Sequence, residues 1–325
     1  MPEPAEPAPE VAVVVATYNR SARLRLLLAS LAAQSLARDR YEVVVVDDAS
    51  TDDTQLALGE ATRQGLPVRS LRIKRGGGPA AARERGWRSS RAALIAFIDD
   101  DCHADPGWLE SIVTEIQPDD WAFLQGRTAP NPAELGRLGP FARTIDIGEL
   151  TTTFNTCNMV YPRAVLERID GFDTEAFGDR RTAGEDTDLA WRAIEVGAQP
   201  RFEPTALAFH AVEDLGPVGM LRIAARWTPA VRAFARHPRL RHDRLVHGVF
   251  WKPTHMWLAR ALLAAVLPRR LWPLAAWLAL PYVRSLWARA KLAGNPGLAP
   301  YYIAFDLIET AAIVRGAARE RTPMA

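Results

Sequence analysis

The chain has 325 residues, a length that suits one large domain or two ordinary ones. Hydrophobic residues make up 48% of it and charged residues 24%, which is the composition of a globular protein with ample material for a core. Its two cysteines, Cys102 and Cys157, are too few to imply a disulfide framework and favour a reducing compartment.

The charge is unevenly distributed, although the net value is only +2. Residues 215–325 contain 17 Lys+Arg and 4 Asp+Glu, whereas residues 1–214 contain 23 and 34. An acidic N-terminal body and a basic C-terminal third indicate different surroundings for the two parts. Residues 1–10, "MPEPAEPAPE", are rich in proline and glutamate and lack the apolar stretch of a secretory signal, so we expect a disordered leader there.

The segment after the leader alternates apolar runs with helical patterns. "VAVVVA" is a continuous apolar run bounded by turn residues, as in a strand buried on both faces of a parallel sheet. Because strands and helices then alternate up to residue 99, we predict an α/β fold with a mostly parallel, doubly wound sheet. The expected strands are 11–16, 41–48, 67–73 and 92–99, and the expected helices are 21–36, 50–65 and 79–90.

Further elements follow Asp101 up to about residue 214, which gives an expected globular domain at 11–214. Residues 128–156 are irregular and rich in proline and glycine, as in many binding loops. The expected helices here are 106–116, 163–169 and 184–197, and the expected strands are 121–127, 157–162 and 206–212.

The last third, 215–325, is basic, rich in tryptophan and expected to be helical. Its apolar segments 254–268 and 271–283 are each about half to two-thirds of the ~20 residues that a spanning helix needs. Interleaved arginines and tryptophans favour interfacial or re-entrant helices on an anionic membrane surface, at the cytoplasmic face of the cell membrane. A short hairpin that crosses the bilayer, or an ordinary helical subdomain of a soluble cytoplasmic protein, remains an open alternative. No nucleic-acid partner is expected, because no recognisable motif for one is present.

Polar residues follow three of the expected parallel strands where each strand ends. "ATYNR" (16–20) follows the first strand, "DDAS" (47–50) ends the second, and "DDD" (99–101) ends the fourth. Each group alone is typical of a turn or a helix cap. Ligands of open parallel sheets bind beyond the carboxyl ends of the strands, so the three groups together predict a binding site at that edge.

In these motifs the chain resembles the inverting glycosyltransferases of family 2, which have the nucleotide-sugar transferase fold called GT-A. The resemblance covers about residues 11–212 and continues, as in a membrane-linked bacterial subgroup, through "FWKPTH" to a final "DLIETAAIVRGAARER". Single motifs such as DxD are weak, but an ordered set is specific. The matching motifs are "VVVATYNR", "EVVVVDDASTDDT", "AARERGW", "IAFIDDDCHADPGWL", "CNMVYPRAVLERIDGFD" and "GEDTDLAWRAIEVG".

The resemblance implies that the first two groups hold the base and ribose of a nucleotide-diphosphate sugar donor. A carboxylate suits a base imide or ribose hydroxyls because it only accepts hydrogen bonds. The residues matched are Thr17, Tyr18, Asn19, Arg20 and Asp48. Asp47 is expected to cap the end of its strand.

The resemblance assigns the triple aspartate to a metal site beside the diphosphate. Clustered carboxylates and a diphosphate repel one another, and a hard divalent cation such as Mn²⁺ or Mg²⁺ makes the arrangement favourable. Asp99 and Asp101 form the DxD pair, and Asp100 is expected to point away from the ion and contact the donor. His210, where many relatives carry a histidine, is a further candidate ligand; a lone histidine is more often not one.

Two further motifs complete the expected site. Arg83 matches an arginine that the family uses near the phosphates or the base, whereas Glu84 departs from the family's usual asparagine and puts local donor contacts in doubt. In "GEDTD", Asp186 would be the general base toward the acceptor hydroxyl, with Glu185 beside it in the family's ED pair. Both acids also suit a helix start, and Asp188 is expected to be structural.

The expected function is a metal-dependent inverting transfer of a sugar onto an acceptor hydroxyl, whether glycan, lipid-linked or small-molecule. A nucleotidyltransferase is one alternative, although a glycine-rich start would then be expected in place of "TYNR". A nucleotide-sugar-binding protein without catalysis is another.

Overall fold

The computed structural model describes residues 8–179 and 183–325. Most of the expected leader therefore lies outside the described residues. The chain divides into two compact units, the first made of Met1–Gly136 and Thr144–Val212, the second of Arg137–Arg143 and Glu213–Ala325. The domain boundary expected after residue 214 stays a prediction.

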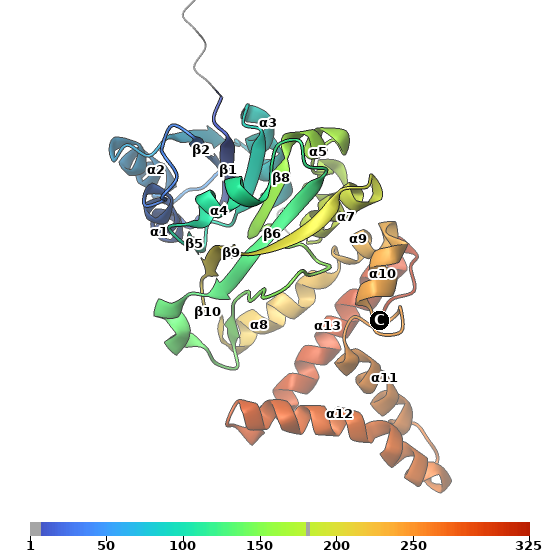
Figure 1. Cartoon of the computed structure of the whole chain (residues 1–325). Coiled ribbons are helices and arrows are strands. Elements are labelled where there is room, and N and C mark those ends of the chain that lie inside the picture. Colours follow the sequence, from blue (N-terminus) through green and yellow to red (C-terminus); the bar gives the residue numbers. More distant parts are fainter. Residues whose placement is uncertain (1–7, 180–182) are drawn as a thin grey trace, which may run out of the picture. The chain divides into compact units, whose positions relative to one another are not determined.

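The first unit is built on an eight-stranded sheet in the order β3-β2-β1-β4-β8-β6-β9-β5 (Figure 1). The pairings β1–β2, β2–β3, β1–β4 and β6–β9 are parallel, whereas β8 runs antiparallel to both β4 and β6. The predicted α/β class with a mostly parallel sheet is confirmed. The strands are β1 Val11–Thr17, β2 Tyr41–Asp47, β3 Val68–Arg72, β4 Leu94–Ile98, β5 Cys102–Ala104, β6 Ala122–Pro130, β8 Asn158–Pro162 and β9 Gln199–His210.

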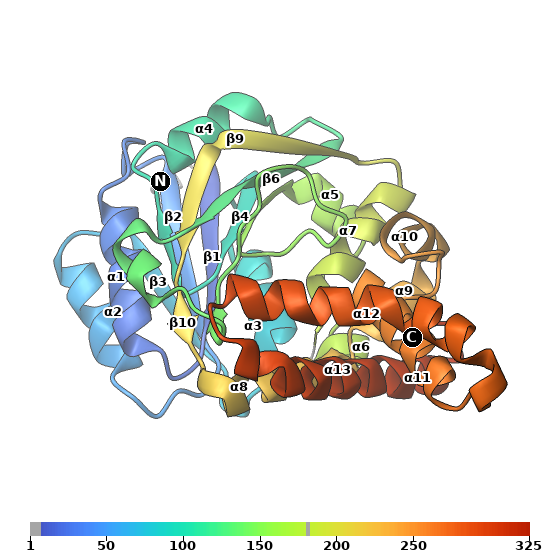
Figure 2. The same ribbon diagram turned by 90° about the horizontal axis from the view of Figure 1, so that it is seen from below.

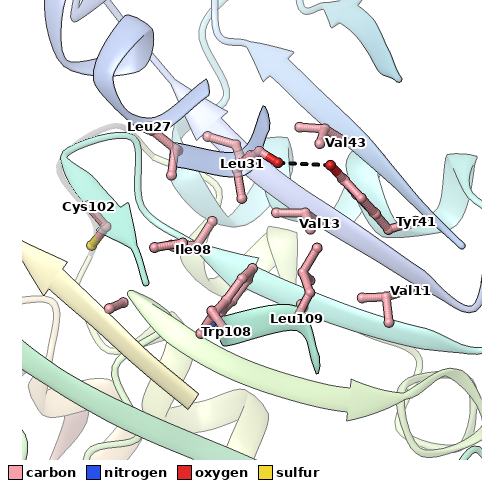
Figure 3. Close-up of a cluster of buried hydrophobic side chains, with 14 of the residues drawn as sticks. Val11, Val13, Leu27, Leu31, Tyr41, Val43, Ile98, Cys102, Trp108 and Leu109 are labelled. Carbon is pink, nitrogen blue, oxygen red and sulfur yellow. Dashed lines mark hydrogen bonds between the residues drawn. The ribbon is translucent and has the colours of Figure 1, made fainter. Parts of the chain in front are cut away.

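Helices cover both faces of this sheet (Figure 2). Leu27 and Leu31 of α1, with Trp108 and Leu109 of α4, lie in one core cluster with Val11 and Val13 of β1 (Figure 3). In that core the Tyr41 hydroxyl donates to the carbonyl of Leu31 at 2.8 Å, which satisfies its one polar atom. The helices are α1 Ser21–Ala32, α2 Thr54–Arg63, α3 Gly78–Ser89, α4 Trp108–Glu115, α5 Arg163–Arg168, α6 Thr174–Phe177 and α7 Glu185–Glu195, with a 3₁₀ turn at Pro132–Arg137.

The opposite face of β1 receives α3 at very close range. A Cβ added to Gly86 would lie 2.5 Å from Cγ1 of Val14 and 3.2 Å from Cγ2 of Val46. Only glycine allows this approach, which draws the arginine one helical turn earlier, Arg83, toward the sheet and buries it.

The second unit is mostly helical, as expected. Helices α11, α12 and α13 outline a triangle in Figure 1, with Leu258, Tyr282 and Leu286 packed among them. The small sheet β7–β10 is antiparallel. The elements are β7 Ala142–Arg143, β10 Glu213–Asp214, α8 Gly216–Ala224, α9 Val231–Arg236, α10 Pro238–Arg244, α11 Pro253–Ala265, α12 Trp272–Leu292 and α13 Ala299–Glu320, with 3₁₀ turns at Ala225–Trp227, Arg269–Leu271 and Pro296–Leu298.

One helix within the described residues is long and apolar enough to cross a membrane. It is Pro296–Glu320, with a mean hydropathy of 1.3, and it is not one of the two segments that the sequence analysis singled out. Length and composition alone give weak evidence, because a core helix of a soluble protein has the same properties.

Candidate functional site

The carboxyl ends of β1, β2 and β4 bring the three predicted polar groups to one edge of the sheet. These strands are adjacent and parallel, with Thr17 in register with Asp47. The hydroxyl of Thr17 donates to Asp100 at 2.8 Å, which joins the first group to the third. The proximity expected from the strand order is therefore present.

The first two groups are also tied to each other. The backbone N–H of Asn19 donates to the hydroxyl of Ser50 at 2.9 Å, and the side-chain oxygen of Asn19 accepts from the N–H of Thr51 at 2.7 Å. Asn19 has a φ of 51°, a left-handed conformation that asparagine tolerates better than most residues. Tyr18 beside it is 42% exposed.

The two aspartates at the end of β2 have different partners. Asp47 accepts from the N–H of Ser50 at 2.7 Å, from Gln55 at 2.6 Å, and pairs with Arg72, so it caps the strand end as expected. Asp48, also buried, accepts from the N–H groups of Gly77 and Gly78 at 2.7 and 3.1 Å. In this structure Asp48 therefore fixes the loop that leads into α3.

Arg20 lies against the second and third aspartates of the triplet. Its Nη1 donates to Asp101 through a short contact and lies 3.4 Å from Asp100. Burial, together with the charge of Asp101, raises the pKa of Asp100 to about 7, although Arg20 opposes the shift. Two buried carboxyl groups thus share one guanidinium, whose single positive charge cannot balance two negative charges.

The short strand β5 brings a histidine to this edge. It pairs antiparallel with β9 and places Cys102 opposite His210, while the N–H of Ala211 donates to the carbonyl of Asp101 at 2.9 Å. The ligand atoms of Asp101, Cys102 and His210 all lie within 4.8 Å of one another.

The chemistry of this group fits a hard divalent cation held by oxygen and nitrogen. The Nδ1 of His210 lies 2.8 Å from the carbonyl of Ala211, which orients the ring so that Nε2 faces Asp101 at 3.5 Å. Burial raises the pKa of the Cys102 thiol well above its usual range, and its Sγ lies 3.7 Å from the carbonyl of Cys157. A protonated thiol is a poor ligand, so Asp101 and His210 are the groups that suit Mn²⁺ or Mg²⁺.

Arg83 connects the triplet to the start of α7. Its Nη2 donates to Asp99 at 2.7 Å and its Nη1 to Glu185 at 3.1 Å, across 102 residues of sequence. The neighbouring charges of Asp99, Glu185 and Asp186 raise the pKa of this buried arginine against the opposing effect of burial. Asp99, which the sequence paired with Asp101 as a metal ligand, therefore has its Oδ1 on Arg83 in this structure.

Asp186 occupies the first turn of α7, which begins at Glu185 directly after Gly184, whose φ is 95°. Burial, with the charge of Glu185 beside it, raises the pKa of Asp186 to about 7, while Arg83 and the N–H of Thr187 oppose the shift. That N–H donates to Asp186 at 2.8 Å. A carboxyl that titrates near neutral pH in such surroundings is well suited to exchange protons.

Family models decide what kind of protein carries this arrangement. A model described as glycosyl transferase family 2 matches residues 12–169, and one described as glycosyl transferase family group 2 matches residues 94–289. The chain belongs to the family 2 glycosyltransferases. This family membership favours sugar transfer over the two alternatives left by the sequence.

Two relatives show how far the sequence similarity of this family 2 glycosyltransferase extends. The pre-mycofactocin glycosyltransferase of Mycobacterium tuberculosis is 30% identical over 213 residues, which cover 62% of this chain and 42% of that protein. The dodecaprenyl-phosphate galacturonate synthase of Rhizobium johnstonii is 33% identical over 119 residues, covering 36% of this chain and 35% of that protein. The chain thus spans less than half the length of these relatives.

A solved structure supports the GT-A fold of the family 2 glycosyltransferase. The mannosyltransferase PcManGT from Pyrobaculum calidifontis, in complex with GDP-Man and Mn²⁺, superimposes with a TM-score of 0.58 at 21% identity. The match covers 99% of this chain and 89% of that one. At this identity the likeness concerns the fold.

Several contacts of the family 2 glycosyltransferase site had no signal in the sequence. The hydroxyl of Thr187 donates to the carbonyl of Thr153 at 2.8 Å, and buried Gln125 accepts from the N–H of Thr151 at 2.8 Å, so the irregular loop is attached to α7 and β6. Glu84, which departs from the family pattern, accepts from the N–H of Phe172 at 2.8 Å. Its carboxylate is thereby occupied by the protein.

Proposed function

We propose that the chain is a metal-dependent inverting glycosyltransferase that moves a sugar from a nucleotide-diphosphate donor to an acceptor hydroxyl. The observation that carries the proposal is the double contact of Arg83 with Asp99 and Glu185. One guanidinium holds the end of β4 and the start of α7 together, so the edge that suits a diphosphate adjoins a half-buried acid, Asp186, that suits a base.

Asp186 would accept the proton of the acceptor hydroxyl during transfer. Its raised pKa of about 7 supports this role, because a general base works best when its pKa lies near the operating pH. Glu185 and Arg83 would hold α7 in place while the hydroxyl approaches the anomeric carbon from the side opposite the leaving group. A single in-line displacement of this kind inverts the configuration.

Asp101 and His210 would hold Mn²⁺ or Mg²⁺, the type of ion present in the complex of PcManGT. When bound, the ion would neutralise charge on the departing nucleoside diphosphate. Arg20 would exchange its contact with Asp101 for one with a phosphate, and Asp100, which accepts from Thr17, would orient Thr17 and Arg20. Asp99 would join the site through Arg83, or through the ion if Arg83 moves.

The donor nucleotide would lie along the ends of β1 and β2. Tyr18 is exposed there and offers a ring face to a base, and Asn19 fixes the loop beside it. Asp48 would bind the base or ribose with a carboxylate lone pair not used by Gly77 and Gly78, because each oxygen accepts more than one hydrogen bond.

The acceptor would be a hydroxyl of a lipid-linked, glycan or small-molecule substrate. The basic second unit favours a peripheral or monotopic position on the cytoplasmic face of an anionic membrane, and a relative named for a dodecaprenyl-phosphate product makes a lipid-linked acceptor reasonable. A soluble cytoplasmic enzyme is the alternative.

Exchange of Asp186 for Asn tests the proposal directly. Turnover of a nucleotide-sugar should fall about 10³-fold while donor affinity, measured by calorimetry with Mn²⁺, changes little. Asp170→Asn is the matched control, since that side chain is 93% exposed and pairs with Arg88. Near wild-type turnover in Asp186→Asn would show that another group is the base.

A further inference from the structure

A groove between α11 and α12 in the second unit has an unusual lining. It has room for about 750 Å³ and is lined by ten residues of the two helices. Three are arginines, Arg260, Arg284 and Arg289, and two are tryptophans, Trp257 and Trp277; among the described residues that line it, none is acidic. The lining thus combines concentrated positive charge with aromatic surface.

The groove is held in shape by contacts that order two of the three arginines. Arg289 donates to Asp306 at 3.0 and 2.6 Å and lies over the ring of Tyr302 at 5.0 Å. Its Nε is buried and has no hydrogen-bond acceptor among the residues that the structure describes. Arg260 lies over the ring of Trp277 at 4.8 Å, while Arg284 is exposed. Ordered guanidinium groups lose little entropy when they bind an anion.

The surroundings of the groove have the same character. Residues 251–300 contain 7 Lys+Arg, no Asp or Glu, and five of the ten tryptophans of the chain. Large apolar side chains on α11, α12 and the turn between them are open to solvent, and exposed apolar surface of this kind is typical of sites that bind a partner or a membrane. They include Leu262, Leu263, Val266, Trp272, Trp277, Val283, Trp287 and Leu292, each 53% to 91% exposed.

The charge and the apolar side chains together select one kind of occupant. A second copy of the chain would bring like charges face to face, which is unfavourable. A nucleic acid would use the arginines but leave the exposed aliphatic side chains in water. An anionic phospholipid surface satisfies both, because phosphates accept from guanidinium groups while tryptophan and aliphatic side chains enter the boundary of the acyl region.

We infer that this groove binds the phosphate of an anionic phospholipid, with α11 and α12 lying along the membrane surface. Arg260 and Arg284 donate to the phosphate, Arg289 stays paired with Asp306, and Trp257 and Trp277 flank the glycerol and upper acyl chain. α11 has 13 residues and so is about 20 Å long, shorter than the ~30 Å hydrocarbon core of a bilayer. α12 has 21 residues, but it contains Arg284, Arg289 and Lys291 and is not one of the described helices that are apolar enough to cross a membrane. The inference rests on the membrane association proposed above and gives it a lipid class and a site.

Sedimentation of the full chain with vesicles tests the site. One set of vesicles is phosphatidylcholine alone and the other is an equal mixture with phosphatidylglycerol. The groove variant is Arg260→Gln with Arg284→Gln, and the charge-matched control is Arg269→Gln with Arg270→Gln, both exposed in the turn between the helices. The control should weaken binding to mixed vesicles by about 30-fold at most, the effect of two surface charges.

The groove variant should bind at least about tenfold more weakly than the control, since it also loses charge-assisted hydrogen bonds. Equal losses would show that binding depends on diffuse charge and overturn the groove. Equal binding of wild type to both vesicles, or its self-association without vesicles, would also overturn the inference. Thermal unfolding of each variant shows whether it is folded. Arg→Lys substitutions at the same positions, which keep the charge, provide a second check on folding.

Release of nucleoside diphosphate from the donor, measured without vesicles, keeps this test separate from the proposed function. Failure of wild type to bind anionic vesicles while this reaction proceeds would overturn the lipid site and leave the transferase intact. The reverse outcome, vesicle binding without any reaction, would keep the lipid site and count against the catalytic proposal.

Discussion

Each of the two units contains a cluster of buried or half-buried acids, and the balance of charge differs between the clusters. In the first unit four carboxylates pair with the guanidinium groups of Arg20 and Arg83, and a fifth, Asp186, lies within the influence of the charge of Arg83. In the second unit two carboxylates of α13 are matched by at least as many cations. The first cluster comprises Asp99, Asp100, Asp101, Glu185 and Asp186; the second comprises Asp306 and Glu309 with Arg289, Lys252 and His255.

The pKa directions separate the clusters. Burial and neighbouring acids raise the pKa values of Asp100 and Asp186 to about 7, whereas hydrogen bonds from His255 and Lys252 lower the pKa of Glu309 in spite of its burial. A buried carboxylate whose charge is balanced by nearby cations can remain ionised within the fold. One whose charge is not balanced tends to bind a cation or a proton. The comparison thus separates the cluster proposed to act in catalysis from the cluster that joins three helices.

Loss of the cation site is expected to have the largest effect. Asp101→Asn should reduce sugar transfer by about 10³-fold, because it removes one of the two groups that suit the ion and leaves the diphosphate charge uncompensated. Mn²⁺ affinity, followed by electron paramagnetic resonance of free Mn²⁺, should fall by at least about tenfold. Chelation of the wild type should abolish activity, and Mn²⁺ should restore it.

The comparison supplies the control for this experiment. Asp306→Asn removes a similarly buried acid from the compensated cluster and should leave the affinity for Mn²⁺ unchanged. Unchanged Mn²⁺ affinity in Asp101→Asn would mean that the ion is held elsewhere and that the first cluster is not the cation site.

The next largest effect is on stability and concerns the second cluster. Glu309 is 1% exposed and accepts from Lys252 at 2.7 and 2.8 Å, with His255 Nε2 at 3.1 Å. Glu309→Gln leaves these groups without their counterion and should lower the free energy of unfolding by about 2 kcal/mol, a value reduced because Lys252 can reach water. Thermal unfolding should then occur about 4–8 °C lower.

Glu320→Gln is the matched control, because Glu320 pairs with Arg232 at the surface and such pairs contribute about 1 kcal/mol or less. If both substitutions change the melting temperature equally, the buried cluster gives no special stability to the second unit.

The edge of the sheet could be predicted from sequence because its causes are local. Apolar runs buried on both faces define β1, β2 and β4, and the residues that follow such strands must meet at one edge. By contrast, β5 has three residues, and its formation depends on pairing with β9 about a hundred residues later. No local sequence pattern predicts a strand of only three residues.

Contacts between residues far apart in the chain also could not be predicted from the sequence. Arg83 was matched to a family position near the phosphates, but its link between Asp99 and Glu185 depends on the close packing of α3 on β1 that Gly86 permits. Likewise, no local pattern in "FWKPTH" or "DLIETA" predicts that the two motifs meet. In the structure, Lys252 and His255 of the first motif both contact Glu309 of the second.

A smaller effect should appear in the pH dependence of transfer. The base must be ionised to accept a proton, so kcat/KM should rise about tenfold per pH unit below the pKa of Asp186 and level off above about pH 7. Steady-state rates at fixed Mn²⁺, with wild-type melting temperatures recorded at each pH, measure this. Glu309→Gln should give the same profile with lower stability, and a flat wild-type profile would exclude Asp186 as the titrating base.

The smallest effect has opposite signs in the two clusters. The folded pKa of Asp100, about 7, lies above its ordinary value of 3.8, so the folded state holds the proton more tightly and loses stability as the pH rises through this window. Asp100→Asn can still accept from Thr17, and it should raise the unfolding free energy of the metal-free protein by about 1 kcal/mol at about pH 8 and by less near pH 5.

Glu309, whose pKa is lowered, gives stability above its ordinary pKa that is lost on acidification. Glu309→Gln should therefore lower the unfolding free energy most at pH 8. Chemical denaturation of both variants at the two pH values measures this difference. A loss of stability in Asp100→Asn at pH 8 would mean that Arg20 fully compensates the acids, and the distinction between the clusters would fail.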